Sequence, residues 1–233
     1  MELDYSHIKV VGFDADDTLW INETYFREAE EAFADLLEHY ETKNKIDQEL
    51  FKVEMNNLEL YGFGIKGFML SMIESAMELS NNNISQESII KILEIGKNMI
   101  SRPVELLDGV EEVLEKLEKK YRLIVLTKGD LLDQERKLDR SGLSKYFHHV
   151  EVLSDKKEVN YKNLLDHLEI EVGEFLMVGN SLKSDVIPIL NIGAAAVHVP
   201  FHTTWAHEVV PEEEQPNDHL TLNSLKDLIK YLN

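Results

Sequence analysis

The segment that decides the fold is Val10-Val11-Gly12-Phe13-Asp14-Ala15-Asp16-Asp17-Thr18-Leu19, in which a short apolar run ends abruptly at acidic residues. Further short apolar runs follow at 122–126, 150–153, 175–178 and 194–199. Continuous apolar runs of this length are typical of parallel strands that are buried on both faces. We therefore predict strands at 8–13 and at the four later runs, all in one parallel sheet.

Helical patterns separate these runs. Asp108 is a predicted N-cap with Glu111 at the third helical position, and regularly spaced apolar residues follow at Val110, Val113, Leu114 and Leu117. Further crossover helices are predicted at 162–168, 181–190 and 224–232. Alternation of strands and helices favours a doubly wound α/β fold.

The interval between Asp14 and Thr127 is far longer than one crossover helix requires, and its pattern is helical. Apolar residues at helical spacing predict four helices there: after Asn22 or Thr24, near 48–61, over 68–79 and after Ser85. Pro103 closes the interval. We therefore predict two domains, an α/β core formed by residues 1–21 and 103–233 and an inserted helical bundle over residues 22–102.

The composition excludes several classes of protein. The 233 residues include 44 acidic and 24 basic side chains, and the formal net charge of −20 would repel nucleic acid and anionic lipid. The absence of cysteine excludes disulfides and thiolate metal sites. Residues 1–7 are polar, and no segment approaches the roughly 20 apolar residues that span a bilayer. We expect a cytoplasmic protein that binds neither nucleic acid nor membranes; its oligomeric state stays open.

Polar residues gather where the predicted strands end. In open parallel sheets, ligands bind at the carboxyl ends of the strands. The residues delivered there are Asp14, Asp16, Thr127, Lys128, Asp155, Lys156, Lys157, Asn180 and Asp185. Two carboxylates near one point, such as Asp14 and Asp185, repel each other unless a cation lies between them. Because the ligands on offer are oxygens, Mg²⁺ is the metal that suits such a site.

The same residue types fit phosphoryl transfer. The hydroxyl of Thr127 and the ammonium of Lys156, placed beside the cation, would hold phosphoryl oxygens. A carboxylate left free to attack phosphorus gives covalent catalysis through an aspartyl phosphate. A second carboxylate two residues later can handle protons, a task that favours a pKa near neutral.

Four motifs, in order along the chain, resemble those of the haloacid dehalogenase superfamily. The first, D-x-D-x-T after an apolar run, lies in the opening segment, and the second, a Thr or Ser that ends the next core strand, matches Thr127. The third, a lysine ahead of a helix, matches Lys156 or Lys157, and the fourth, a variant of G-D-x4-D, matches Gly179-Asn180-x4-Asp185. The resemblance covers essentially the whole chain and implies a Rossmann-like core. The place of the insert resembles the helical cap of the phosphatase, phosphomutase and dehalogenase branch, which closes over the substrate and excludes water.

The resemblance also implies a role for each site residue. Asp14 would be the nucleophile and a metal ligand, and Asp16 would protonate the leaving group and then deprotonate water, with its backbone carbonyl on Mg²⁺. Thr127, Lys128 and Lys156 would bind phosphoryl oxygens, with Lys157 as the alternative to Lys156. Asp185 would complete the metal site. Two positions depart from many members: Asn180 could contribute only a neutral carbonyl or a bridging water, and Asp17 replaces a frequent glycine and is predicted to be a turn residue.

The leading hypothesis is a Mg²⁺-dependent phosphatase for a small phosphorylated metabolite, such as a sugar phosphate or a nucleoside monophosphate. Haloacid dehalogenation is an alternative, but that branch needs no metal and generally lacks the second aspartate of the first motif, so Asp16 and Asp185 argue against it. A phosphomutase would use the same Asp14 and Asp16, and the sequence does not separate it from a phosphatase. A receiver-like signalling module would carry its motifs in a different order, and a non-catalytic binding protein would be expected to have lost a key residue.

Overall fold

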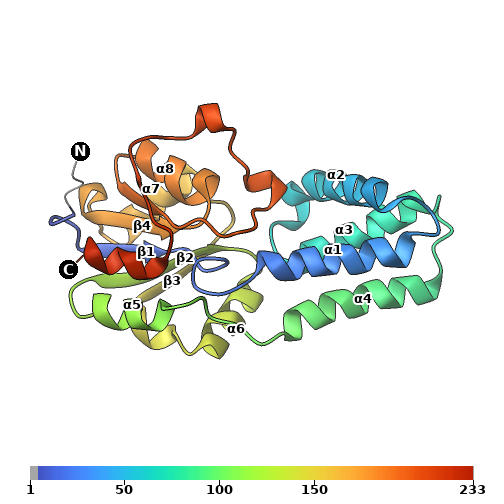
Figure 1. Ribbon diagram of the computed structural model, residues 1–233, viewed down its shortest axis with the longest axis horizontal. Helices are drawn as coiled ribbons and strands as arrows, with labels where there is room; N and C mark the ends of the chain where they lie inside the picture. Colours follow the sequence, from blue (N-terminus) through green and yellow to red (C-terminus); the bar gives the residue numbers. More distant parts are fainter. Residues whose placement is uncertain (1–4, 233) are drawn as a thin grey trace. The chain divides into compact units, whose positions relative to one another are not determined.

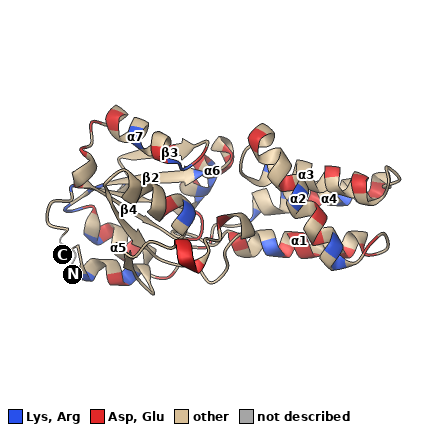
Figure 2. Cartoon of the chain, turned by 90° about the horizontal axis from the view of Figure 1, so that it is seen from above, with Lys and Arg blue, Asp and Glu red and all other residues tan. Residues whose placement is uncertain are grey.

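The computed structural model of the protein describes residues 5–232, which form two compact units (Figure 1). An α/β unit contains the residues up to Glu23, together with 104–128 and those from Arg136 onward. A helical unit contains 24–103 and also the short segment 129–135. Acidic and basic residues are interspersed along the helices of both units (Figure 2).

The α/β unit is built on a six-stranded parallel sheet, which confirms the predicted fold class. The strands are β1 (Val10–Phe13), β2 (Arg122–Lys128), β3 (His149–Leu153), β4 (Phe175–Gly179), β5 (Ala195–His198) and β6 (Leu220–Thr221), in the order β3-β2-β1-β4-β5-β6. The first five correspond to the five predicted runs. The two-residue strand β6 was not predicted, because two residues are too few to form a hydrophobic pattern.

The register of the central strands brings their carboxyl ends to one edge. Within β1, Phe13 lies beside Val125 of β2 on one side and Val178 of β4 on the other. The backbone N–H of Asp14 then donates to the carbonyl of Val178 at 2.9 Å. All pairs in the sheet are parallel, so the residues that follow β1, β2, β3 and β4 emerge at the same edge.

Helices cover both faces of the sheet, as a doubly wound fold requires. On one face, α5 (Val110–Leu117), the later part of α6 (Leu131–Ser141) and a C-terminal 3₁₀ segment (Leu225–Lys230) pack on a core that contains Val11 and Phe13. On the other face, α7 (Glu158–His167) and α8 (Ile187–Asn191) pack on a core that contains Val10 and Phe175. A π-helical turn, Leu182–Val186, leads into α8.

Four local features differ from the sequence predictions. The helix predicted over 224–232 is a shorter 3₁₀ segment, Leu225–Lys230. Helix α6 was not predicted, because its sequence LLDQERKLDRS is mostly charged or polar and Leu131 and Leu132 are exposed. Asp108 is not the N-cap of α5: Gly109 takes that position with φ +78°, and the Asp108 carboxylate pairs with Lys226 instead. The predicted helix over 181–190 is divided between the π-helical turn and α8.

The helical unit contains α1 (Glu23–Leu37, whose first residue belongs to the α/β unit), α2 (Lys43–Tyr61), α3 (Ile65–Leu79) and α4 (Gln86–Ser101). The four helices share an apolar core that contains Phe33, Leu50, Met72 and Ile92. Ser85 caps α4 as expected, because its hydroxyl accepts a hydrogen bond from the backbone N–H of Ser88 at 3.0 Å. Among the described residues, no helix has both the length and the apolar character needed to cross a membrane.

Candidate active site

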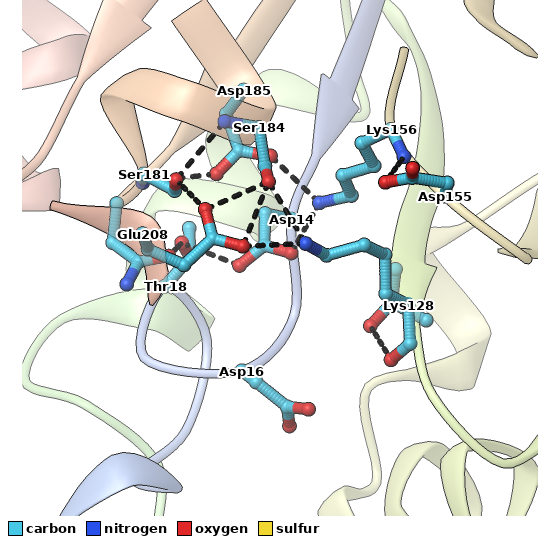
Figure 3. A network of polar contacts seen from close by, with 12 residues as sticks. Asp14, Asp16, Thr18, Lys128, Asp155, Lys156, Ser181, Ser184, Asp185 and Glu208 are labelled. Carbon is cyan, nitrogen blue, oxygen red and sulfur yellow. Dashed lines mark hydrogen bonds and ion pairs between the residues drawn. The ribbon is translucent and has the colours of Figure 1, made fainter. Parts of the chain in front are cut away.

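Three charged side chains meet at the carboxyl edge of the sheet (Figure 3). The Lys156 ammonium lies 2.5 Å from Asp14 Oδ1 and 2.7 Å from Asp185 Oδ1. All three residues are buried, with exposed fractions of 6% for Asp14, 3% for Lys156 and 1% for Asp185. The neighbouring Lys157 is exposed, stands at the N-cap of α7 and pairs with Asp155 at 2.8 Å. The structure therefore brings Lys156, and not Lys157, to the two carboxylates.

The chain after β4 is shaped to deliver Asp185. A Cβ atom at Gly179 would lie 2.3 Å from the Asp185 carboxyl carbon, so only glycine lets this side chain fold back over the end of the strand. The Asp185 Oδ2 atom accepts a hydrogen bond from the backbone N–H of Ser181 at 3.0 Å. The Ser181 hydroxyl in turn accepts from the backbone N–H of Ser184 at 3.0 Å. These bonds fix the turn that carries both Asn180 and Asp185.

The pKa values within this group of Asp14, Lys156 and Asp185 are set by burial and by the interactions among the three charges. Burial raises the pKa of the Asp14 carboxyl, the Lys156 ammonium opposes this, and the Asp185 carboxylate adds to the rise. Burial alone would lower the pKa of Lys156, but the Asp14 and Asp185 carboxylates hold it well above its usual value. The sequence predicts a cation between Asp14 and Asp185, and in the structure the Lys156 ammonium lies there. Within residues 5–232, no three acidic or histidine side chains cluster as a metal site.

A different set of oxygens fits a magnesium ion. Asp14 Oδ2 and the backbone carbonyl of Asp16 both face the Asn180 side-chain amide at 3.2 Å. In one orientation of the Asn180 amide, its nitrogen donates to both oxygens. Rotation of the amide by 180° places Asn180 Oδ1 there instead, so that all three oxygens point toward one place. Carboxylate, backbone carbonyl and amide oxygens are hard ligands of the kind that Mg²⁺ takes together with water. The donor set therefore fits Mg²⁺. Like those of Asp14, both carboxylate oxygens of Asp185 also accept hydrogen bonds, here from Lys156 and the backbone N–H of Ser181.

The Asp16 side chain points away from this group (Figure 3). Its Oδ1 accepts hydrogen bonds from Trp20 Nε1 at 2.7 Å and from the Lys137 ammonium at 2.6 Å. Lys137 lies on α6, the helix that the sequence pattern does not reveal, so this contact was missed. Asp17 is a turn residue as expected, with φ +62°, and its carboxylate accepts from the backbone N–H groups of Asn22 and Glu23. Burial raises the pKa of Asp17 to about 8.

Thr127 and Lys128 end β2 beside the trio. Thr127 is buried, and its hydroxyl lies 3.3 Å from the backbone carbonyl of Lys128. The Lys128 ammonium donates to Ser184 Oγ at 2.9 Å and pairs with Glu208 at 2.6 Å. Glu208 was not a candidate from the sequence, because it lies in an irregular segment without a motif. The structure thus gives the Lys128 ammonium a carboxylate partner, where the sequence led us to expect a phosphoryl group.

Comparisons with known proteins agree with this geometry. Residues 8–193 match the sequence model of the haloacid dehalogenase-like hydrolases, which confirms the resemblance and the prediction of a hydrolase. A haloacid dehalogenase-like family hydrolase from Xanthomonas campestris is 36% identical, with a TM-score of 0.86 over 100% of this chain and 94% of that one. The N-acylneuraminate-9-phosphatase of Mus musculus is 25% identical over 96% of this chain and 93% of its own length. A glyceraldehyde 3-phosphate phosphatase of Pyrococcus abyssi is 33% identical over 38% of this chain and 40% of its own.

Proposed function

Because this chain belongs to the haloacid dehalogenase-like hydrolase family, we propose that it is a Mg²⁺-dependent phosphatase that acts through a phosphorylated Asp14. One observation carries the proposal: the two oxygens of Asp14 face different groups. Oδ1 faces the Lys156 ammonium, whereas Oδ2 accepts a hydrogen bond from the Thr18 hydroxyl at 3.0 Å and faces the Asn180 amide. A carboxylate held in this way can bind a metal with one oxygen and attack phosphorus with the other.

The substrate class follows from the relatives and from the chemistry of the site. The names of the two relatives are those of phosphatases, and they favour a small phosphomonoester of the sugar phosphate type. A nucleoside monophosphate is the second class that we include. The net charge of −20 disfavours nucleic acid as a substrate, and we expect the protein to work in the cytoplasm.

In the first step, Asp14 Oδ1 attacks phosphorus and the bond from phosphorus to the ester oxygen breaks. Asp16 gives its proton to the leaving alkoxide, which requires its side chain to turn from Trp20 and Lys137 toward the substrate. Lys156 and the Thr127 hydroxyl hold the phosphoryl oxygens, and the charge of Lys128 lies beside them. In the second step, water attacks phosphorus, Asp16 takes the proton, and Asp14 and inorganic phosphate are released.

Bound Mg²⁺ would neutralise charge on the phosphoryl group and orient it for in-line attack. Asp14 Oδ2, the Asp16 carbonyl and Asn180 Oδ1 are the atoms that would hold the metal ion. Asp185 would support this site by orienting the Lys156 ammonium and by stabilising the turn that carries Asn180. We further propose that residues 22–102 act as a cap that excludes water from the catalytic core, formed by 1–21 and 103–233.

A metal-independent dehalogenase is the second candidate, and Asn180 is the observation that favours it. A neutral amide that donates to Asp14 would orient this nucleophile for attack on carbon without a metal ion. Under this alternative, haloacids would be hydrolysed in the presence of EDTA. A phosphomutase would instead return the phosphoryl group to the substrate, so product analysis separates it from a phosphatase.

A phosphate-release assay tests the proposal. Purified protein would be offered a panel of sugar phosphates, nucleoside monophosphates and para-nitrophenyl phosphate, with Mg²⁺ and with EDTA. We expect Mg²⁺-dependent release by the wild type and by Asp166→Asn, an exposed control with the same change of side chain. Asp14→Asn should lower the rate by a factor of about 10⁴ or more, because the nucleophile is lost. Release that persists in Asp14→Asn, or none by the wild type on any ester, would refute the proposal.

A further inference from the structure

Glu208 is a largely buried carboxylate to which the proposed mechanism gives no role. It ends a 3₁₀ turn, Ala206–Glu208, in the long connection between β5 and β6. Its side chain is only 11% exposed, yet it lies beside the catalytic edge of the sheet (Figure 3). A carboxylate is rarely buried to this extent unless it is paired and hydrogen-bonded.

Three donors surround the Glu208 carboxylate. The Lys128 ammonium contacts Oε1 at 2.6 Å, and the Ser184 hydroxyl contacts Oε2 at 2.7 Å. The Ser181 hydroxyl also donates to Oε2. Although burial alone would raise it, the Lys128 ammonium and these hydrogen bonds lower the pKa of Glu208 to about 2. The donors come from the end of β2 and from the turn after β4, so one carboxylate joins two parts of the site.

Each of these donors has a neighbour in the candidate active site. Lys128 directly follows Thr127 in β2. Ser181 directly follows Asn180, and its backbone N–H donates to Asp185 Oδ2. Ser184 directly precedes Asp185 and accepts a hydrogen bond from Lys128. Glu208 therefore contacts the residues that lie next to Thr127, Asn180 and Asp185 in the chain.

The Lys128 ammonium explains why a carboxylate is needed here. The Lys128 side chain is only 14% exposed, and a buried ammonium without a counter-ion is strongly unfavourable. Glutamine could replace the hydrogen bonds of Glu208 in part, but it would remove the negative charge that lies 2.6 Å from the Lys128 ammonium. The ammonium would then move toward solvent, and the turn that holds Asn180 and Asp185 would lose two of its hydrogen bonds.

We propose that Glu208 is a positioning residue of this active site, which fixes the Lys128 ammonium and the Ser181–Asp185 turn in the arrangement that receives the phosphoryl group. The inference depends on the proposed phosphatase function, and it assigns to the β5–β6 connection a part in catalysis that no motif of the chain indicates. Glu208 acts through Lys128 and the two serines and does not touch the substrate.

Three variants test this proposal in the full-length protein: Glu208→Gln, Glu208→Asp and the control Glu213→Gln, which removes the same charge from an exposed position. We expect Glu208→Gln to lower kcat/KM about 10- to 100-fold, the usual effect of removing a group that orients a functional residue. Glu208→Asp should recover part of the loss, because it restores the charge, and Glu213→Gln should stay within about twofold of the wild type.

Chemical rescue separates positioning from general stability. In Glu208→Ala, formate can enter the space vacated by the carboxylate, pair with Lys128 and restore part of the activity. Formate should not activate the wild type or Glu213→Gln. Calorimetric titration with inorganic phosphate in the presence of Mg²⁺ gives a readout without turnover, and we expect at least tenfold weaker binding in Glu208→Gln. If Glu208→Ala does not fold, the comparison of Glu208→Gln with Glu208→Asp distinguishes a positioning role of the carboxylate from a purely structural one.

Two results would overturn the inference while leaving the phosphatase function intact. One is an active wild type with Glu208→Gln within twofold of it in both kcat/KM and phosphate affinity. The other is a loss of activity in Glu208→Gln that neither Glu208→Asp nor formate with Glu208→Ala restores, which would indicate a purely structural role. A wild type that releases no phosphate from any ester would instead refute the proposed function itself.

Discussion

Two lysines at the same edge of the sheet, the buried Lys156 and the partly buried Lys128, differ in how their charge is balanced. Lys156 lies between two carboxylates, Asp14 and Asp185, so this group carries one negative charge in excess when both carboxyls are ionised. The Lys128 ammonium pairs with the Glu208 carboxylate, and the charges of these two groups balance each other. Excess negative charge in a buried site favours a bound cation, whereas a neutral pair favours a fixed geometry. From this comparison we infer that the group around Lys156 takes part in the reaction, whereas the Lys128–Glu208 pair holds neighbouring residues in place.

Removing Lys156 should have the largest effect. Lys156→Met leaves Asp14 and Asp185 facing each other without a cation, and we expect kcat/KM to fall by at least about 10³-fold. We also expect the free energy of unfolding to fall by about 3–5 kcal/mol, the usual cost of an uncompensated buried charge. Activity assays and urea denaturation measure the two effects. An equally stable Lys156→Met variant would show that the two carboxylates do not depend on this ammonium.

The acid–base role of Asp16 predicts a loss that depends on the leaving group. Asp16→Asn should lower kcat about 10²- to 10⁴-fold on an alkyl phosphate, because the leaving alkoxide must be protonated. On para-nitrophenyl phosphate the effect on ester cleavage should be much smaller, because nitrophenolate leaves without a proton. Burst kinetics of nitrophenolate release separate ester cleavage from hydrolysis of the phosphorylated enzyme. Equal losses on both substrates in the cleavage step would contradict this role.

A substitution at Asn180 tests the role of negative charge around Asp14 further. Asn180→Asp would add a second negative charge next to Asp14 Oδ2 and the Asp16 carbonyl, so Mg²⁺ should bind more tightly. We expect the Mg²⁺ concentration that gives half-maximal activity to fall about tenfold. Titration of activity with Mg²⁺ measures this value, and Asn191→Asp, on α8, serves as the control substitution. An unchanged Mg²⁺ requirement would place Asn180 outside the metal site.

Substitution of Asp17 should have the smallest effect on activity, and its effect should appear in the pH dependence of stability. Burial raises its pKa to about 8, against about 3.9 in the unfolded chain, so the folded state binds more protons between these values. Its contribution to stability is therefore present at low pH and is lost as the pH rises through about 8. In EDTA, the melting temperature of the wild type should fall between pH 5 and pH 8.5, and that of Asp17→Asn should fall by about 10 °C less. Identical slopes would contradict the shifted pKa.

The residues that could be predicted from the sequence are those placed by the strands. Asp14, Thr127 and Lys128 follow or end buried strands, and the parallel register brings them to one edge whatever the details of the loops. Asp185 was found through its spacing from the end of β4. The choice between Lys156 and Lys157 needed the structure, because adjacent residues ahead of a helix point in different directions and the sequence alone does not say which direction is inward.

The residues that were missed lie on elements with weak patterns. Lys137 is on α6, where charged residues outnumber apolar ones, so helical spacing of apolar residues gives no signal. Glu208 lies in the connection between β5 and β6, whose position depends on the hydrogen bonds that Glu208 itself makes. Such contacts join residues that are far apart in the chain, so they cannot be predicted from secondary-structure propensity or from the periodicity of apolar residues.

The account is tested most directly by a crystal structure with Mg²⁺ and beryllium fluoride, which imitates a phosphorylated aspartate. The expected result is beryllium bonded to Asp14 Oδ1 beside Lys156 and Thr127, with Mg²⁺ held by Asp14 Oδ2, the Asp16 carbonyl and Asn180. Beryllium bonded to any other residue, or crystals of active protein in which Asp14 stays unmodified and Mg²⁺ binds elsewhere, would contradict it.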